Sequence, residues 1–145
     1  MTGAGADEFA PGSRNWTGLR ERAVSAMEQA YAPYSNFRVG AALLGSDGSI
    51  AVGCNVENAS YPAGICAERA AVAAAICGGV RDFAAIVICT EADTPTPPCG
   101  MCRQVLMEFA PELVVLSVTR SGAEAQWTLS DLLPKAFTPT SLGRR

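Results

Sequence analysis

Apolar residues recur at helical spacing from residue 17 to about residue 30, and this period predicts an amphipathic helix. One face of the helix would carry Leu19, Ala23, Ala26, Met27, Ala30 and Tyr31. Thr17 is a candidate cap for its first turn, and Pro33 ends it because the residue before a proline disfavours helical geometry. Residues 1–15 are rich in Gly, Ala and Ser and lack this period, so we expect a mobile leader there.

Two runs with strand character follow, over residues 37–44 and 49–56, and turn residues at 45–48 separate them. We therefore predict a hairpin. The second strand ends in Asn55-Val56-Glu57-Asn58, where three of four side chains are polar. Such a cluster is usually a solvated loop, and the alternative is an edge that recognises a ligand.

The second half of the chain alternates between helical and continuous apolar patterns. Residues 66–77 are rich in Ala and apolar almost all round, so we expect a buried helix that stops at the glycines 78 and 79. A buried strand over 83–89, a proline-rich loop over 90–98 and a helix over 99–110 come next. Strands over 113–118 and 125–129 and a helical turn over 130–133 complete the pattern.

Buried strands separated by helices predict an α/β sandwich in which some strands pair in parallel. The length of 145 residues suits one domain with a sizeable core. We place this domain at residues 16–138, with a tail over residues 139–145. No internal repeat or domain linker interrupts it.

Composition excludes several classes of function. The net charge is −3 and Lys135 is the one lysine, so there is no basic cluster for a nucleic-acid partner. The apolar runs are too short to cross a bilayer and no signal peptide is evident, so we expect no membrane partner and a cytoplasmic location. The chain has no histidine, which removes Ser-His and Cys-His mechanisms and leaves proton transfer to other side chains.

Six cysteines in a cytoplasmic chain indicate metal binding or catalysis more than disulfides. Cys54, Cys77 and Cys89 lie in apolar runs, and we interpret them as small buried hydrophobic residues. The other three lie in two short motifs, Cys66-Ala67-Glu68 and Pro98-Cys99-Gly100-Met101-Cys102. We therefore place the candidate chemistry in these two motifs.

Three thiolates and a nearby carboxylate have the composition of a catalytic zinc site. Zinc prefers four tetrahedral ligands, so three cysteines leave one position for water, and Glu68 can handle the proton of that water. Both motifs fall at predicted helix starts, where the helix dipole offsets the negative charge of the thiolates. We expect Arg69 and Arg103, which directly follow motif residues, to add hydrogen bonds to the sulfurs.

Other interpretations of the motifs stay open at this point. The spacing of Cys99 and Cys102 also fits a redox pair, although that motif typically lies beside a thioredoxin-like βαβ unit. A structural zinc site would need a fourth ligand from one of the remaining cysteines. Glu68 could also be an acidic residue of a first helical turn, where the dipole favours any carboxylate.

The two motifs resemble the signature of the zinc nucleobase deaminases, Cys-x-Glu followed by Pro-Cys-x-x-Cys. With no histidine, the chain is similar to the three-cysteine branch of the cytidine and deoxycytidylate deaminase family, the small homotetrameric cytidine deaminases. The resemblance extends over about residues 18–137. Its further blocks are Tyr31-Ala32-Pro33-Tyr34-Ser35-Asn36-Phe37, Val39-Gly40-Ala41-Ala42-Leu43, Gly53-Cys54-Asn55-Val56-Glu57-Asn58, Cys102-Arg103-Gln104 and Leu132-Leu133-Pro134-Lys135-Ala136-Phe137.

The resemblance implies a three-layer sandwich with a mixed five-stranded sheet flanked by helices. It implies one Zn²⁺ per chain held by Cys66, Cys99 and Cys102, with Glu68 as the proton shuttle. The implied substrate-binding residues are Phe37 against the pyrimidine ring, Asn55 and Glu57 at the ribose hydroxyls, Val56 and Ala67, and Phe137, which would close the site of a neighbouring subunit.

The implied reaction is the zinc-dependent hydrolytic deamination of cytidine and deoxycytidine to uridine and deoxyuridine, with release of ammonia, in pyrimidine salvage. A carboxylate near the sugar disfavours phosphate, so Glu57 favours a free nucleoside over a nucleotide. Two rivals remain. One is a related deaminase for another aminopyrimidine compound, such as a nucleoside antibiotic, and the other is a structural-zinc module without catalysis.

Overall fold

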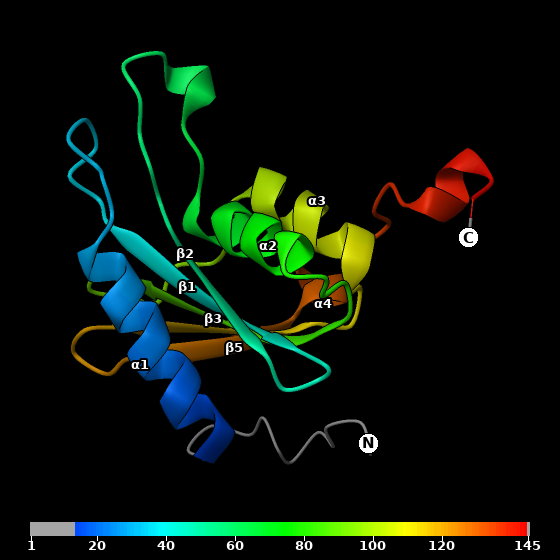
Figure 1. Ribbon diagram of the computed structural model, residues 1–145, viewed down its shortest axis with the longest axis horizontal. Coiled ribbons are helices and arrows are strands. Elements are labelled where there is room, and N and C mark those ends of the chain that lie inside the picture. The colour runs from blue at the N-terminus through cyan, green and yellow to red at the C-terminus, as the bar shows by residue number, and fades with distance from the viewer. Residues whose placement is uncertain (1–13, 145) are drawn as a thin grey trace.

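The computed structural model describes residues 14–144, so nearly all of the predicted leader over residues 1–15 lies outside the described residues. The order of helices and strands is the predicted one (Figure 1). Two short 3₁₀ helices, η2 (Tyr61–Ala63) and η3 (Pro139–Leu142), add to it. The main elements are α1 (Arg14–Glu28), β1 (Val39–Gly45), β2 (Ile50–Cys54), α2 (Ala67–Cys77), β3 (Phe83–Thr90), α3 (Gly100–Phe109), β4 (Val114–Thr119), β5 (Glu124–Thr128) and α4 (Leu129–Leu132).

The five strands form one mixed sheet in the order β2-β1-β3-β4-β5. β1 pairs antiparallel with both β2 and β3, β3 pairs in parallel with β4, and β4 pairs antiparallel with β5. α3 joins the parallel pair, because parallel neighbours need a crossover connection. The predicted mixed sheet is therefore confirmed.

Helices cover both faces of the sheet and produce three layers (Figure 1). On one face α1 packs against β1, β2 and β3, and Trp16 is fully buried there in a core that also contains Leu116 and Val118 of β4. On the other face α2 and α3 cover a second core that contains Leu106. Successive side chains of β3 point to opposite cores, Val87 to the α1 side and Ile86 and Ile88 to the other, as the period of a strand requires.

The close approach of α2 to β2 depends on Gly53. A Cβ atom at this position would lie 2.3 Å from the Ala67 carbonyl oxygen and 2.4 Å from the Ala71 backbone nitrogen. Any side chain there would push the start of α2 away from the sheet. Because Cys66 caps α2, this contact also fixes where Cys66 and Glu68 lie above the edge of the sheet.

The predicted start of the first helix is wrong. α1 begins at Arg14, so Thr17 lies inside the helix and does not cap it, and the helix ends at Glu28 rather than near residue 30. Trp16 lies three residues before Leu19 and is also fully buried, so the apolar face begins one turn earlier than the sequence period indicated.

The prediction that α2 is a buried helix holds for one face only. Its face with Ala73, Ala74 and Cys77 is exposed in the chain. Helix composition alone does not decide burial here, because a small apolar side chain such as Ala costs little when it is exposed. The interpretation of Cys77 as a buried residue is therefore wrong, whereas Cys89 is buried and Cys54 is half-buried.

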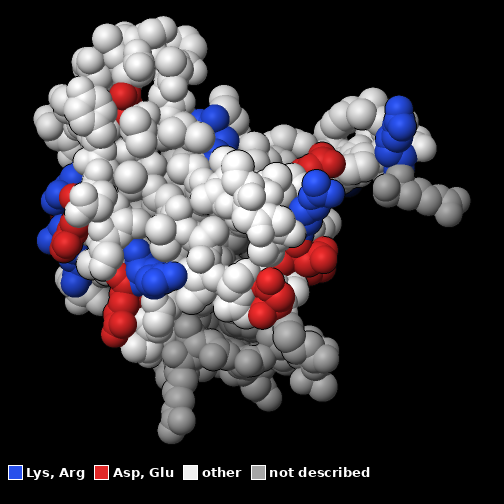
Figure 2. Space-filling model, viewed as in Figure 1, with Lys and Arg blue, Asp and Glu red and all other residues white. Residues whose placement is uncertain are grey.

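After α4 the chain leaves the body of the molecule and forms η3, which projects to one side in Figure 1. Phe137 and Leu142 on this segment are 59% and 68% exposed. Figure 2 shows the molecule from the same side as Figure 1. The centre of the face turned to the viewer is uncharged, and acidic and basic side chains lie around its rim. No helix within residues 14–144 is long and apolar enough to cross a membrane.

Candidate active site

Three cysteine side chains meet where two helices begin. Cys66 is the N-cap of α2, Cys99 is the N-cap of α3, and Cys102 lies in the first turn of α3. The Cys66 and Cys99 sulfurs are 3.9 Å apart, and the Cys99 and Cys102 sulfurs are 3.4 Å apart. All three sulfurs lie within 4.8 Å of one another. The fold therefore brings the two sequence motifs into one thiol cluster.

The direction of the strands explains why these motifs meet. β2 and β3 run the same way, because β1 is antiparallel to both, and β4 is parallel to β3. The carboxyl ends of these strands therefore share one edge of the sheet. α2 is the next α-helix after β2 and α3 follows β3, so both helices begin at this edge. Ligand sites of open α/β sheets typically lie there.

The thiol cluster fits a zinc ion. Tetrahedral Zn–S bonds of about 2.3 Å place sulfurs about 3.8 Å apart. The Cys66–Cys99 sulfur distance of 3.9 Å matches this spacing, and the Cys99–Cys102 distance of 3.4 Å is somewhat shorter. Within residues 14–144 no fourth His, Cys, Asp or Glu side chain joins the group. One coordination position is thus left for a non-protein ligand, which is the pattern of catalytic zinc sites rather than of structural ones.

The surroundings of the cluster favour a thiolate at Cys66. Each helix N-terminus contributes roughly half a positive charge, and Arg69 Nη2 donates to Cys66 Sγ at 3.5 Å. A hydrogen bond from Cys102 lowers the pKa of Cys66 to about 5, with further contributions from Arg69 and Cys99. The same hydrogen bond, together with burial, raises the pKa of Cys102. The hydrogen bonds and the Arg69 charge around Cys66 therefore favour its thiolate form.

Arg103 contacts the main chain around the site. Its Nε donates to the Pro98 carbonyl at 2.7 Å, and its Nη1 donates to the Leu132 carbonyl at 2.8 Å. These two hydrogen bonds hold the loop before Cys99 against α4. A hydrogen bond from Arg103 to a sulfur stays a prediction.

Glu68 is the second residue of α2 and is 5% exposed. Burial raises the pKa of its carboxyl group, and the negative charge of Cys66 adds to the rise. A carboxyl group with a raised pKa takes up and returns a proton more readily near neutral pH than a surface carboxylate does. The residue therefore has the environment of a general acid and base.

A cavity of about 300 Å³ reaches Glu68 and two of the cysteines. Part of its wall is apolar and suits an aromatic ring, and part is polar and suits hydroxyl groups. The apolar part includes Phe37, Val39 and Ile88. The predicted site residues that line the cavity are Phe37, Asn55, Glu57, Cys66, Ala67, Glu68 and Cys99.

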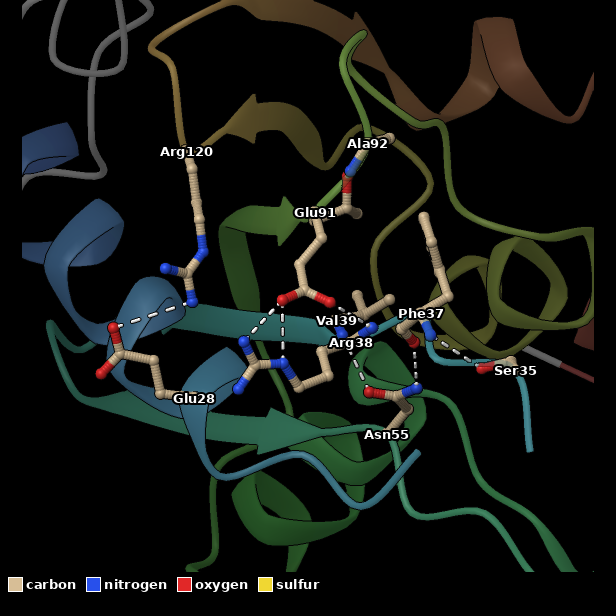
Figure 3. Close-up of polar contacts among 10 residues, drawn as sticks. Glu28, Ser35, Phe37, Arg38, Val39, Asn55, Glu91, Ala92 and Arg120 are labelled. Atoms are coloured by element: carbon tan, nitrogen blue, oxygen red, sulfur yellow. Dashed lines mark hydrogen bonds and ion pairs between the residues drawn. The ribbon is translucent and has the colours of Figure 1, made fainter. Parts of the chain in front are cut away.

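Asn55 is held between two main-chain groups of the cavity wall. Its Oδ1 accepts the Val39 N–H and its Nδ2 donates to the Phe37 carbonyl, both at 2.8 Å (Figure 3). Each end of a side-chain amide has capacity for one more hydrogen bond. Asn55 is therefore oriented by the protein and still able to bind a ligand.

Glu57 is held by the segment that precedes β1. Its Oε1 accepts the backbone N–H groups of Tyr34 and Ser35 at 3.0 and 3.1 Å, and its Oε2 accepts the Ser35 hydroxyl. The hydrogen bonds from Ser35 lower the pKa of Glu57. The cavity thus has a fixed negative charge on one side.

Two predicted substrate-binding residues lie outside the cavity of their own chain. Val56 is exposed, and its main chain bridges Tyr31 and Ile65. Phe137 lies on the projecting C-terminal segment, where its carbonyl accepts the Gln104 Nε2 hydrogen at 2.8 Å. Neither side chain lines the cavity.

The cavity also has lining residues that the sequence did not predict. Val39 follows Phe37 by two residues, so strand alternation places both on the same face and was an available signal. The others come from different segments that meet only in the folded chain, so their place in the wall has no local sequence signal. The missed lining residues are Ser35, Val39, Ile88, Thr90, Thr96 and Pro97.

A buried serine positions the loop that leads to Cys99. Ser117 on β4 is fully buried, and its hydroxyl donates to the Thr96 carbonyl at 2.7 Å. This hydrogen bond fixes the loop 91–98 against the sheet just before the metal-ligand motif. A hydroxyl inside an otherwise apolar strand was the one sequence signal for this role, because a buried polar group needs a partner.

An open three-thiolate site beside a buried carboxyl group, at the base of a cavity, defines a metal-dependent enzyme of the hydrolytic class. The family model described as the cytidine and deoxycytidylate deaminase zinc-binding region matches residues 16–118. The chain belongs to this family, and the predicted family and zinc cofactor are confirmed.

Relatives support the same assignment over nearly the whole chain. The cytidine deaminase of Halalkalibacterium halodurans is 48% identical over 121 residues, which is 83% of this chain and 92% of the relative. The cytidine deaminase of Mycobacterium tuberculosis is 42% identical over 131 residues, 90% of this chain and 95% of the relative. The crystal structure of a cytidine deaminase from Burkholderia pseudomallei superposes with a TM-score of 0.80 at 49% identity, covering 83% of this chain and 98% of that one.

Proposed function

We propose that the chain deaminates cytidine and deoxycytidine hydrolytically to uridine and deoxyuridine, with release of ammonia, and acts in pyrimidine salvage. The observation that carries the proposal is one cavity that joins a three-thiolate zinc site, the buried Glu68 carboxyl, an apolar wall and the polar groups of Asn55 and Glu57. Relatives named cytidine deaminase match over most of their length.

The zinc ion would be held by Cys66, Cys99 and Cys102, and when bound it lowers the pKa of water towards neutrality. Glu68 accepts a proton from the attacking water and delivers it to N3 of the cytosine ring, which makes C4 electrophilic. The water oxygen adds to C4, and Glu68 passes the second proton to the amino nitrogen. The C4–N bond then breaks and ammonia leaves, so the two protons of water are accounted for.

The cavity wall supports recognition of a neutral nucleoside. Phe37 presents an aromatic side chain to the ring, and Asn55 and Glu57 present hydrogen-bonding groups to the ribose hydroxyls. The charged carboxylate of Glu57 repels a phosphate group, so the substrate is the free nucleoside rather than a nucleotide. Ala67 lines the same cavity, and a contact of Val56 with the substrate stays a prediction.

The oligomer is part of the proposal. Phe137 is 59% exposed, lies on a segment that projects from the body, and does not line the cavity of its own chain. A homotetramer in which Phe137 closes a neighbouring site accounts for these three features together. The cytoplasmic location and the division into a leader over 1–15, a catalytic domain over 16–138 and a tail over 139–145 stay predictions.

A substrate panel followed by ultraviolet absorbance tests the proposal with zinc-analysed protein. Conversion of cytidine to uridine, with a much slower reaction of cytidine monophosphate, supports it. If an aminopyrimidine nucleoside antibiotic is turned over faster than cytidine, the alternative function, deamination of such a compound, is favoured instead. One zinc per chain without turnover of any of these compounds would contradict the proposed activity and favour a structural role.

A further inference from the structure

The β1–β3 ladder ends beside the substrate cavity, at the pair Val39 and Thr90. Arg38 and Glu91 occupy the next position on each strand, where main-chain pairing has stopped. Here the Glu91 side chain replaces the missing partner, because its Oε2 accepts the Arg38 N–H at 3.3 Å. Its Oε1 accepts the Arg38 Nε at 2.9 Å and the Arg38 Nη2 at 2.5 Å (Figure 3). We call Arg38 and Glu91 the ladder-end pair.

The ladder-end pair and Asn55 both bind the main chain of residues 37–39. Asn55 binds the Phe37 carbonyl and the Val39 N–H, and Glu91 binds the N–H of the residue between them. Three successive residues are thus fixed by two side chains from different elements (Figure 3). Phe37 and Val39 line the cavity, whereas strand alternation directs Arg38 to the opposite face.

The charges around the pair favour its ionised form. Arg120, in the β4–β5 turn, lies near Glu91 and also pairs with Glu28 at 3.9 Å (Figure 3). The hydrogen bond from Arg38 lowers the pKa of Glu91, and Arg120 contributes to the same shift. Side-chain exposures of 36% for Arg38 and 28% for Glu91 mean that such a pair adds little to stability. Its geometry, with three hydrogen bonds to one carboxylate, matters more for position.

We propose that Arg38 and Glu91 are positioning residues for substrate binding, which extend the β1–β3 ladder by one pair and hold Phe37 and Val39 at the cavity wall. The inference rests on the proposed nucleoside deaminase function. Neither side chain touches the reacting atoms, and neither lines the cavity. A wall that contacts the body of the substrate binds it equally in the ground state and the transition state, so its displacement raises KM and leaves kcat unchanged.

The test compares Glu91→Ala, Glu91→Gln and Arg38→Ala with the parent enzyme on cytidine. Glu91→Ala removes every contact of the pair, and we expect its KM to rise up to about fivefold, the limit for an exposed ion pair. Glu91→Gln keeps an oxygen for the Arg38 N–H and should recover part of this loss. Glu124→Gln is the matched control, because it breaks the ion pair of Arg20 with Glu124 on β5, away from the cavity.

A second measurement follows the wall without using activity. Hydrogen exchange of the peptide that spans residues 37–39 should be faster in Glu91→Ala than in the parent and unchanged in Glu124→Gln. An unchanged KM in Glu91→Ala, or losses of kcat that track a lower Tm, would overturn the inference while the proposed function stands. A parent enzyme that does not deaminate cytidine would refute the proposed function instead, and the exchange rates would then decide alone whether Glu91 holds the wall.

Discussion

The floor and the rim of the site are built in different ways. The floor consists of Cys66, Cys99, Cys102 and Glu68, all at helix starts, and the mutual distances of the three sulfurs already suit a metal within one chain. The rim consists of strand ends and loops around Phe37, Asn55 and Glu57, and the exposed Phe137 lies away from it. A single chain therefore brings the thiol cluster and a buried carboxyl group together, and in the proposed function the rim selects the substrate and a neighbouring chain completes it.

Replacing one cysteine of the floor should abolish metal binding. Cys102 is fully buried and sits 3.4 Å from the Cys99 sulfur, so Cys102→Ser removes a soft donor that the site cannot replace. We expect loss of both zinc content and turnover, measured by metal analysis and the cytidine assay. Cys77→Ser is the control, because that thiol is exposed and outside the cluster. Equal loss in both variants would show that general thiol chemistry, and not the cluster, is responsible.

Glu68→Gln should separate proton transfer from metal binding. The amide is isosteric and still fits the buried position, but it cannot accept or return a proton. We expect kcat to fall about 10²–10⁴-fold, the usual contribution of a general acid or base, with zinc content unchanged. Glu108→Gln, an exposed carboxylate on α3, provides the comparison. A Glu68→Gln enzyme with near-parent kcat would remove Glu68 from the mechanism.

The same division explains what the sequence could predict. The floor follows from local rules, since the motifs contain the ligands and the helix starts that place them, and the α/β order follows from hydrophobic periodicity. The carbonyl partners of Arg103, Pro98 and Leu132, could not be predicted because they become neighbours only in the folded chain. Thr96 was missed because its place in the wall depends on the buried Ser117. The exposed face of α2 could not be predicted, because an alanine-rich helix gives no sign of which side it buries.

Phe137 offers the sharpest test of whether the rim needs a second chain. Phe137→Ala should raise KM for cytidine about tenfold, the effect of losing the burial of part of an aromatic side chain. Leu142→Ala changes another exposed apolar residue of the same segment and should not raise KM.

Mixed oligomers decide whether the contribution comes from the neighbour. Subunits with Phe137→Ala have an intact floor, and subunits with Glu68→Gln have an intact Phe137. If Phe137 acts on a neighbouring site, some sites in a refolded mixture combine Glu68 of one subunit with Phe137 of the other. Such mixtures should show a low KM together with a high kcat, a combination that neither variant shows alone. Unrescued mixtures that form the same oligomer would place the effect of Phe137 within its own chain.

Glu57→Gln should give the smallest and most selective change at the rim. The substitution removes the negative charge but keeps an oxygen that can accept hydrogen bonds from the Tyr34 and Ser35 N–H groups. With less repulsion of phosphate, the ratio of kcat/KM for cytidine over cytidine monophosphate should fall several-fold, by about the factor of five that 1 kcal/mol represents. Asp93→Asn removes one charge from the loop beside the cavity without altering the lining, so it measures the effect of net charge alone. If both variants change the ratio equally, discrimination comes from the general field of the protein, and the fixed position of the Glu57 carboxylate has no part in it.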